Sequence, residues 1–198
     1  MERPSPGAEK IAYNSEVIES AIDQVKSGDK QAYAFIIREF EKKIYTYCYC
    51  ILKSREGAED ATQDIFIKAY QNIDRYEKQA PFSRWLYKIA YYHCLDQIRK
   101  QSRWQQLVSL YRERQSLLFS SYDNTEQAVH ELLTHLNREE RNILLLKVVE
   151  QYSFEEIGQI MDCKPATLRQ KYARLRKKLT KQKKYEGGMS HGEMAKRT

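Results

Sequence analysis

Residues 153–184, SFEEIGQIMDCKPATLRQKYARLRKKLTKQKK, decide the fold of the second half of the chain, because they predict two helices joined by a tight turn. Ser153 and Glu156 have the S-x-x-E spacing of a capping box, so a helix begins at about Phe154. That helix ends near Met161, and Asp162 tolerates the turn that follows. Pro165 suits the first turn of the second helix, where its missing N–H needs no partner.

The second of these helices is amphipathic and strongly basic. Its apolar face is formed by Leu168, Tyr172, Leu175 and Leu179, which recur at helical spacing. The opposite face carries Ala166, Gln170, Ala173, Arg174 and Lys177. The segment 164–184 holds ten Lys or Arg and no Asp or Glu, whereas the net charge of the whole chain is +7. A solvated charged helix end is the simpler interpretation. The turn before a basic amphipathic helix favours a helix in the DNA major groove.

Composition narrows the class of protein. The chain has 198 residues, of which 41% are hydrophobic, enough for one large or two small domains. Gly and Pro are few and alternating patterns are hard to find, so we expect an all-α fold. No apolar run could span a membrane or serve as a signal peptide, which predicts a cytoplasmic protein. The four cysteines are scattered, which predicts free thiols, and the sequence predicts no metal site and no cofactor.

Helical periodicity and capping residues divide the first half of the chain. A helix over 16–27 is broken by Gly28, and a longer one runs from Asp29 to about Leu52. Ser54 caps a third helix, 55 to about 74, which turns Ala61, Ile65, Ala69 and Ile73 inward and Asp60, Gln63, Asp64 and Lys68 outward. A fourth helix runs from Phe82 to about Lys100, with Phe82 and Trp85 assigned to the core.

The predicted organisation is two small helical domains joined by a flexible linker. Within the second domain we expect a helix over 125–136, an N-x-x-E cap at Asn137 and a helix over 138–150. The full division is a flexible arm over 1–15, a first domain over 16–100, a linker over 101–122, a second domain over 123–184 and a disordered tail over 185–198.

Three stretches carry a family resemblance. AEDATQDIFIKAYQNIDRY at 58–76, FSRWLYKIAYYHCLDQIRK at 82–100 and LNREERNILLLKVVEQYSFEEIGQIMDCKPATLRQKYARLRKKL at 136–179 resemble bacterial RNA polymerase sigma factors of the small extracytoplasmic-function (ECF) type. The resemblance implies that the first domain is sigma region 2, which binds core RNA polymerase and the minus-ten element. It implies that the second is sigma region 4, which reads the minus-thirty-five element.

The resemblance also implies two surfaces on the first domain. The acidic, outward strip of the third helix, formed by Asp60, Gln63 and Asp64, is expected to contact the polymerase clamp, although a solvated face without a partner would look the same. Cationic and aromatic side chains suit a single strand, which is held by charge and by stacking of its bases. The minus-ten candidates are Arg75, Tyr76, Lys78, Gln79, Tyr87, Lys88, Tyr91 and Tyr92.

In the recognition helix, chemistry divides base contacts from phosphate contacts. Gln can pair bidentately with adenine and Arg with guanine. We assign Gln170, Ala173 and Arg174 to base edges, Arg169 to either role, and Lys171, Arg176, Lys177 and Lys178 mainly to phosphates. Three positions depart from the family pattern: Ala166 stands where glycine is usual, Lys171 where arginine is usual, and Tyr92 where asparagine is common.

Two other classes of protein would share some of these features. A stand-alone helix-turn-helix repressor or activator would use the same second domain and bind a palindromic site as a dimer. An enzyme would need an acid–base or metal set, and Asp60, Asp64 and Asp96 have no histidine at ligand spacing, so we expect no enzyme.

The resemblance also implies partners. The family is commonly bound by an anti-sigma protein, often membrane-anchored, so we expect such a partner in addition to core polymerase and to duplex and single-stranded promoter DNA.

Overall fold

The computed structural model describes residues 6–109 and 135–192, with side-chain surroundings for 15–102 and 135–180. Within those ranges the chain is helical and contains no strand, as the all-α prediction requires. It divides into two compact units, Met1–Leu133 and Thr134–Thr198. The expected domain boundary at 123 and most of the helix expected over 125–136 lie outside the described residues.

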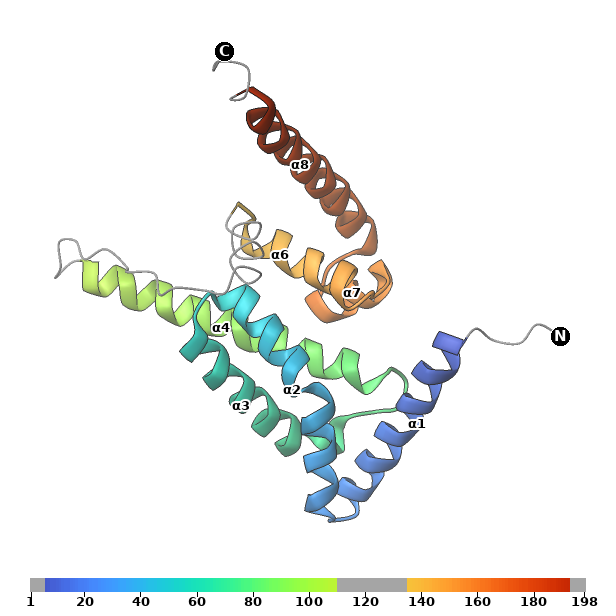
Figure 1. Cartoon of the computed structure of the whole chain (residues 1–198). Coiled ribbons are helices and arrows are strands. Elements are labelled where there is room, and N and C mark those ends of the chain that lie inside the picture. Colours follow the sequence, from blue (N-terminus) through green and yellow to red (C-terminus); the bar gives the residue numbers. More distant parts are fainter. Residues whose placement is uncertain (1–5, 110–134, 193–198) are drawn as a thin grey trace. The chain divides into compact units, whose positions relative to one another are not determined.

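The described residues of the first unit, 6–109, form four α-helices, and α2 contacts each of the other three (Figure 1). They are α1 (Pro6–Lys26), α2 (Lys30–Leu52), α3 (Arg55–Gln71) and α4 (Phe82–Ser109), with a short 3-10 helix η1 (Ile73–Arg75) after α3. Gly28, with a φ of 105°, makes the turn between α1 and α2, a left-handed conformation that glycine adopts without strain. The core includes Ile22, Ile36, Ile44, Ile65 and Leu86, each of which is fully buried.

Local capping signals place the starts of these helices. Asp29 accepts a hydrogen bond from the Gln31 amide at 2.9 Å, and Ser54 accepts one from the Gly57 amide at 3.1 Å. Both caps satisfy backbone donors that a helix start leaves unpaired. The predicted inward set of α3 is buried and its predicted outward set is exposed, so both are confirmed.

Two boundaries of the first unit differ from the sequence prediction. Residues 6–15 were expected to be a flexible arm, yet α1 begins at Pro6, where proline fits the first helical position and Ala8, Glu9 and Ala12 follow. Residues 101–109 were expected to be linker, yet they extend α4, because QSRWQQLVS holds neither Gly nor Pro to stop a helix. The remaining linker residues, 110–122, lie outside the described ranges.

The second unit contains α6 (Arg138–Leu144), a single π-helical turn η2 (Leu145–Val149), α7 (Phe154–Met161) and α8 (Pro165–Gly192). The tail prediction is corrected here, since α8 continues through 185–192 and only 193–198 lie outside the described residues. No proline follows Pro165, so nothing removes a backbone donor from that helix. Capping boxes begin α6 at Asn137 and α7 at Ser153, and both are confirmed.

Candidate nucleic-acid and polymerase interfaces

The turn of the helix-turn-helix is held by close packing against α7. Asp162 adopts the left-handed conformation at a φ of 51°, and the Cys163 amide donates to the Gly158 carbonyl at 3.0 Å. A Cβ atom at Gly158 would lie 2.6 Å from the Cys163 carbonyl oxygen, which is inside van der Waals contact. Glycine is therefore required at position 158, and the turn sets the direction in which α8 leaves α7.

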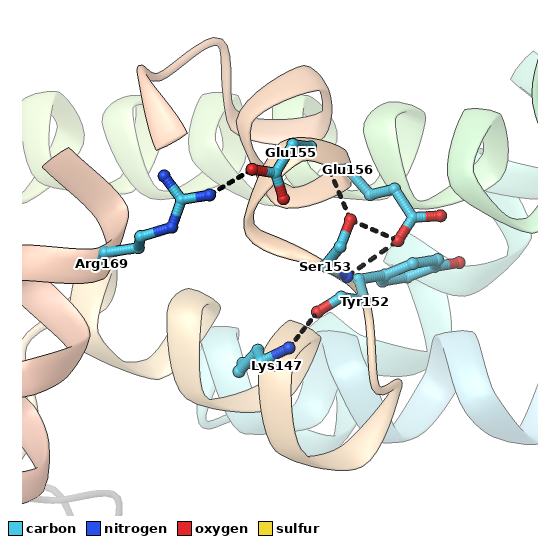
Figure 2. A network of polar contacts seen from close by, with 6 residues as sticks. All are labelled: Lys147, Tyr152, Ser153, Glu155, Glu156 and Arg169. Atoms are coloured by element: carbon cyan, nitrogen blue, oxygen red, sulfur yellow. Dashed lines mark hydrogen bonds and ion pairs between the residues drawn. The ribbon is translucent and has the colours of Figure 1, made fainter. Parts of the chain in front are cut away.

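The capping box of α7 is part of a larger polar network that reaches α8 (Figure 2). The Ser153 amide and hydroxyl both donate to Glu156 Oε2 at 2.8 Å. Lys147 donates to the Tyr152 carbonyl at 2.9 Å, and the Arg169 guanidinium is ion-paired with Glu155. Arg169 also lies 5.7 Å from the ring centroid of Phe154. The start of α8 is thus bound to the start of α7.

Two more cations of α8 are paired within the second unit. Lys171 is ion-paired with Glu139, and Lys178 with Glu140 at 2.9 Å. Burial on its own would raise the pKa of Glu140, but hydrogen bonds from Lys178 and from the Asn137 amide bring that pKa below its ordinary value. Three of the eight predicted minus-thirty-five residues, Arg169, Lys171 and Lys178, therefore already have acidic partners.

The other five predicted residues of α8 form an exposed strip. Leu168 and Leu175 are buried against the unit, which turns the opposite face of α8 to solvent. None of the cations of the strip makes an ion pair with another described side chain. The strip consists of Gln170, Ala173, Arg174, Arg176 and Lys177, and we call it the α8 strip.

The predicted minus-ten residues divide between surface and core. Tyr76 is 2% exposed and packs edge-on against Phe82 with ring centroids 5.3 Å apart. Tyr87 is fully buried and packs edge-on against Tyr47 at 5.3 Å. Neither ring can stack on a base in this structure, so both are corrected to core residues. The expected core assignment of Phe82 is confirmed, whereas Trp85 is half-buried.

The remaining six minus-ten candidates are accessible. Arg75, Lys78 and Gln79 are exposed on η1 and the loop that follows it, and Lys88 and Tyr92 are exposed on α4. Tyr91 is half-buried and packs against Tyr92 with ring centroids 5.2 Å apart. Lys78 is ion-paired with Asp23 of α1 at 2.6 Å, and that hydrogen bond raises the pKa of Lys78. The half-buried Trp85 lies on the same face of α4 as Lys88 and Tyr92. The apolar residues next to Trp85 in the sequence had favoured a core position instead.

The acidic strip of α3 is exposed as predicted, and it continues into apolar residues that the sequence reasoning missed. Asp60, Gln63 and Asp64 are exposed. One turn further, Ile67 is 54% exposed and Tyr70 is 36% exposed. The helical spacing of Gln63 and Ile67 places them on one face, which was the available signal. We call Asp60, Gln63, Asp64 and Ile67 the α3 strip.

A buried histidine lies beneath the α3 strip. His93 Nδ1 is 2.6 Å from Lys68 Nζ, and His93 Nε2 is 3.8 Å from Asp64 Oδ2. Burial lowers the pKa of His93, and the neighbouring Lys68 cation lowers it further. The hydrogen bond between Lys68 and the imidazole links α3 to α4. Among the described residues no group of His, Cys, Asp or Glu side chains could hold a metal ion.

The cysteines agree with the free-thiol prediction. Cys48, Cys50 and Cys94 are buried, Cys163 is half-buried, and all four are free. Cys48 and Cys94 lie close to each other in the core, with their Sγ atoms 3.7 Å apart. No helix in the described part of the chain is long and apolar enough to cross a membrane.

Both units match known family models. The model for sigma-70 region 2 matches residues 36–103, and the model for sigma-70 region 4 matches residues 126–179. The ECF RNA polymerase sigma factor SigW of Bacillus subtilis is 31% identical over 183 residues, covering 84% of this chain and 96% of its own. This chain belongs to the ECF sigma factors of the sigma-70 family. A sigma factor, rather than a stand-alone repressor or activator, is what the paired regions indicate.

One further relative is similar in sequence, and two solved structures are similar in fold. The sigma-H factor of Pseudomonas aeruginosa is 24% identical over 174 residues, covering 81% of this chain and 90% of its own. Among solved structures, CnrH in complex with the cytosolic domain of CnrY has a TM-score of 0.65 at 17% identity, covering 85% of this chain and 98% of that one. RpoE in complex with the anti-sigma factor NepR from Bartonella quintana also has a TM-score of 0.65, at 21% identity, covering 75% of this chain and 94% of that one.

Proposed function

We propose that this sigma factor binds core RNA polymerase through the α3 strip, holds the separated minus-ten strand with the loop after η1 and one face of α4, and reads minus-thirty-five DNA with the α8 strip. The observation that carries the proposal is that one chain presents an acidic partner face and two separate cationic faces. A stand-alone regulator would need only the last of these. Sigma factors are regulatory DNA-binding proteins, and we propose no catalytic activity for this one.

The α3 strip has the composition of a protein-binding surface. Asp60 and Asp64 are exposed acids that would attract a basic clamp surface and speed encounter. Ile67, 54% exposed, would supply an apolar anchor next to them, and buried anchors surrounded by polar residues dominate binding energy in most interfaces. The hydrogen bond between Lys68 of α3 and His93 would help to keep this face fixed on α4.

On the α8 strip, we assign Gln170, Ala173 and Arg174 to base edges and Arg176 and Lys177 to phosphates. The alanine would let the helix backbone approach the groove, while Gln and Arg supply bidentate pairs to adenine and guanine. Arg169, Lys171 and Lys178 are given a supporting role, since each would have to leave an acid to reach a phosphate. The Arg169–Glu155 pair is exposed on both sides, and an exposed ion pair contributes little to stability, so exchanging Glu155 for a phosphate on binding costs little free energy.

On the first unit, we assign the minus-ten strand to Arg75, Lys78, Gln79, Lys88, Tyr91 and Tyr92. The exposed ring of Tyr92 offers a stacking face, and the cations offer phosphate contacts along the strand. The half-buried Trp85 is added to this surface because its position on α4 lies next to Lys88. Tyr76 and Tyr87 are omitted because they are buried.

The proposal extends to partners and location. Two structures similar to this chain are complexes, one with the cytosolic domain of CnrY and one with the anti-sigma factor NepR. We propose that this sigma factor is likewise held by an anti-sigma protein, which a membrane anchor could attach to the cell envelope. We place the sigma factor itself in the cytoplasm, a reducing compartment that agrees with its four free thiols.

Run-off transcription from a genomic library, with core polymerase and with or without this protein, tests the proposed function. We expect new transcripts that share one minus-thirty-five and one minus-ten sequence. The double variant Asp60→Lys with Asp64→Lys should lose core polymerase in a pull-down and lose those transcripts. Glu39→Lys with Glu41→Lys, which reverses two exposed acids of α2, is the matched control and should keep both. Transcription that is unchanged by the Asp60 and Asp64 variant would contradict the clamp assignment.

A further inference from the structure

Helix α1 is bonded to the loop that follows η1. Lys26 Nζ donates to the Tyr76 carbonyl oxygen at 2.7 Å, and the Tyr76 hydroxyl donates to the Glu19 carboxylate. Asp23 accepts from Lys78 at 2.6 Å. The three α1 residues are spaced four and three apart, so they share one helix face. A single face of α1 therefore contacts both the start and the middle of the loop.

Tyr76 is the centre of this contact. Its ring is 2% exposed and packs against Phe82 and Trp85, with centroids 5.3 Å and 5.6 Å apart. Its hydroxyl oxygen also lies 2.7 Å from the Ala80 carbonyl oxygen, four residues along the chain. The Tyr76 side chain thus lies against both ends of segment 76–80 and shares its one hydroxyl proton between Glu19 and Ala80, while Lys78 and Gln79 stay exposed.

The contacts of α1 with Tyr76 are costly to break. Lys26 places a cation on a backbone carbonyl, and hydrogen bonds with a charged partner are stronger than neutral ones. Glu19 Oε2 is buried and has no hydrogen-bond partner among the described residues, so the carboxylate depends on its other oxygen and Tyr76. The exposed Asp23–Lys78 pair contributes less, because solvent screens it.

We propose that α1 is a positioning element for minus-ten recognition: Lys26 and Glu19 hold Tyr76, and Tyr76 holds segment 76–80 in the conformation that presents Lys78 and Gln79 to the separated strand. This inference rests on the proposed function of that loop. A loop that is fixed before binding loses less conformational entropy when the strand arrives, which strengthens binding without any new contact. Lys26 and Glu19 are positioning residues and touch no DNA themselves.

The test uses holoenzyme assembled from core polymerase and the full chain. The probes are a labelled single-stranded oligonucleotide carrying the minus-ten sequence found by run-off transcription and a labelled minus-thirty-five duplex. Lys26→Met should weaken binding of the single strand about tenfold, the size expected for a lost charge-assisted hydrogen bond. Affinity for the duplex and for core polymerase should not change. Lys26→Arg, which keeps a cationic donor, should restore most of the loss.

Two further variants keep the test decisive. Tyr76→Phe removes only the hydroxyl and should weaken the single strand in the same selective way. Lys42→Met removes the same charge from an exposed position of α2 and should change nothing. A loss that is equal for the strand, the duplex and core polymerase would mean that α1 only stabilises the fold, and it would overturn the inference.

Direct-contact variants separate this inference from the proposed function. If Gln79→Ala and Lys88→Ala weaken the single strand but Lys26→Met and Tyr76→Phe do not, the loop works without α1, and the positioning role alone is wrong. If Gln79→Ala and Lys88→Ala have no effect, the minus-ten surface is assigned wrongly and the inference falls with it. Selective losses in both sets of variants support both.

Discussion

The two surfaces proposed to contact DNA differ in how the fold limits them. On the first unit, burial decides which candidates are accessible, since Tyr76 and Tyr87 lie in the core while Tyr92 is exposed. On the second unit every candidate remains on α8, but ion pairs occupy Arg169, Lys171 and Lys178. Residue type therefore indicates the chemistry of a surface, and contacts with distant residues decide which side chains can use it.

The largest expected effect is a loss of stability that is confined to the second unit. Gly158→Ala forces a Cβ to within 2.6 Å of the Cys163 carbonyl oxygen, so we expect the second unit to lose about 3 kcal/mol of stability. Both tryptophans of the chain lie in the first unit, so their fluorescence should report unchanged unfolding of that unit while circular dichroism reports an earlier loss of helix.

Gly57→Ala is the matched control for that variant. A Cβ at Gly57 would lie 3.3 Å from the Ser54 side chain, a much looser contact than the 2.6 Å at Gly158, and alanine favours the helix. We expect a change within about 1 kcal/mol. If Gly158→Ala were as well tolerated as Gly57→Ala, the close turn before α8 would not set the geometry of the second surface.

The next effect is a difference in strand affinity between variants of an exposed tyrosine and of a buried tyrosine on the first unit. Tyr92→Ala should weaken binding of the minus-ten single strand by holoenzyme by about 1–3 kcal/mol, the usual contribution of one stacked base. Tyr87→Phe keeps the buried ring and should leave strand affinity unchanged. Titration of a labelled single strand measures both. Equal losses would mean that burial does not decide which rings contact DNA.

The two units should also respond to acid in different windows. Burial and Lys68 lower the pKa of His93 from its ordinary 6.5, so the unfolded chain takes up a proton at a higher pH than the folded unit does. The folded first unit therefore becomes less stable as pH falls below 6.5. The pKa of Glu140 is lowered from 4.5, so its contribution is complete above 4.5 and is lost as pH falls through the lowered value. Thermal unfolding between pH 7 and 4, followed by tryptophan fluorescence and by circular dichroism, should show the first unit responding first. His93→Gln should remove the early response.

The smallest effect tests the ion pairs of α8. Glu155→Gln releases Arg169 and should make the dependence of duplex affinity on salt steeper by up to about one counterion, with little change in sequence preference. The matched control is Glu150→Gln, which neutralises a half-buried acid of the same unit outside the α8 pairs and should leave the slope unchanged. Titrations over a range of salt concentrations measure the slope. An unchanged slope for Glu155→Gln would indicate that Arg169 already contacts phosphate in the wild type.

Local signals in the sequence predicted most of the fold. Asp29, Ser54, Asn137 and Ser153 each cap a helix through bonds spanning two or three residues, so the sequence alone contains the whole interaction. Boundaries without a cap or a breaker were predicted less accurately, as the early start of α1 and the extension of α4 illustrate. Helix propagation there depends on small propensities that a pattern of apolar residues does not reveal.

The candidate sites could be predicted only in part, because their limits come from residues far apart in the sequence. Tyr76 is buried by Phe82 and bonded by Glu19, which is 57 residues away. Lys171 is paired with Glu139, 32 residues away. Such partners follow from packing between helices, which helical periodicity does not specify. The α3 strip was predicted correctly as an exposed acidic face, since its exposure follows from the periodicity of a single helix.

The most direct test of the account measures which cations of α8 read bases. Holoenzymes carrying Arg174→Ala, Lys177→Ala or Lys171→Ala would each select duplexes from a library randomised over the minus-thirty-five element. Arg174→Ala should relax one base position and cost about 1–3 kcal/mol, whereas Lys177→Ala should weaken all sequences alike and Lys171→Ala should leave the preferred sequence unchanged. Uniform losses for Arg174→Ala, or a base preference altered by Lys171→Ala, would contradict the division between the exposed strip and the paired cations.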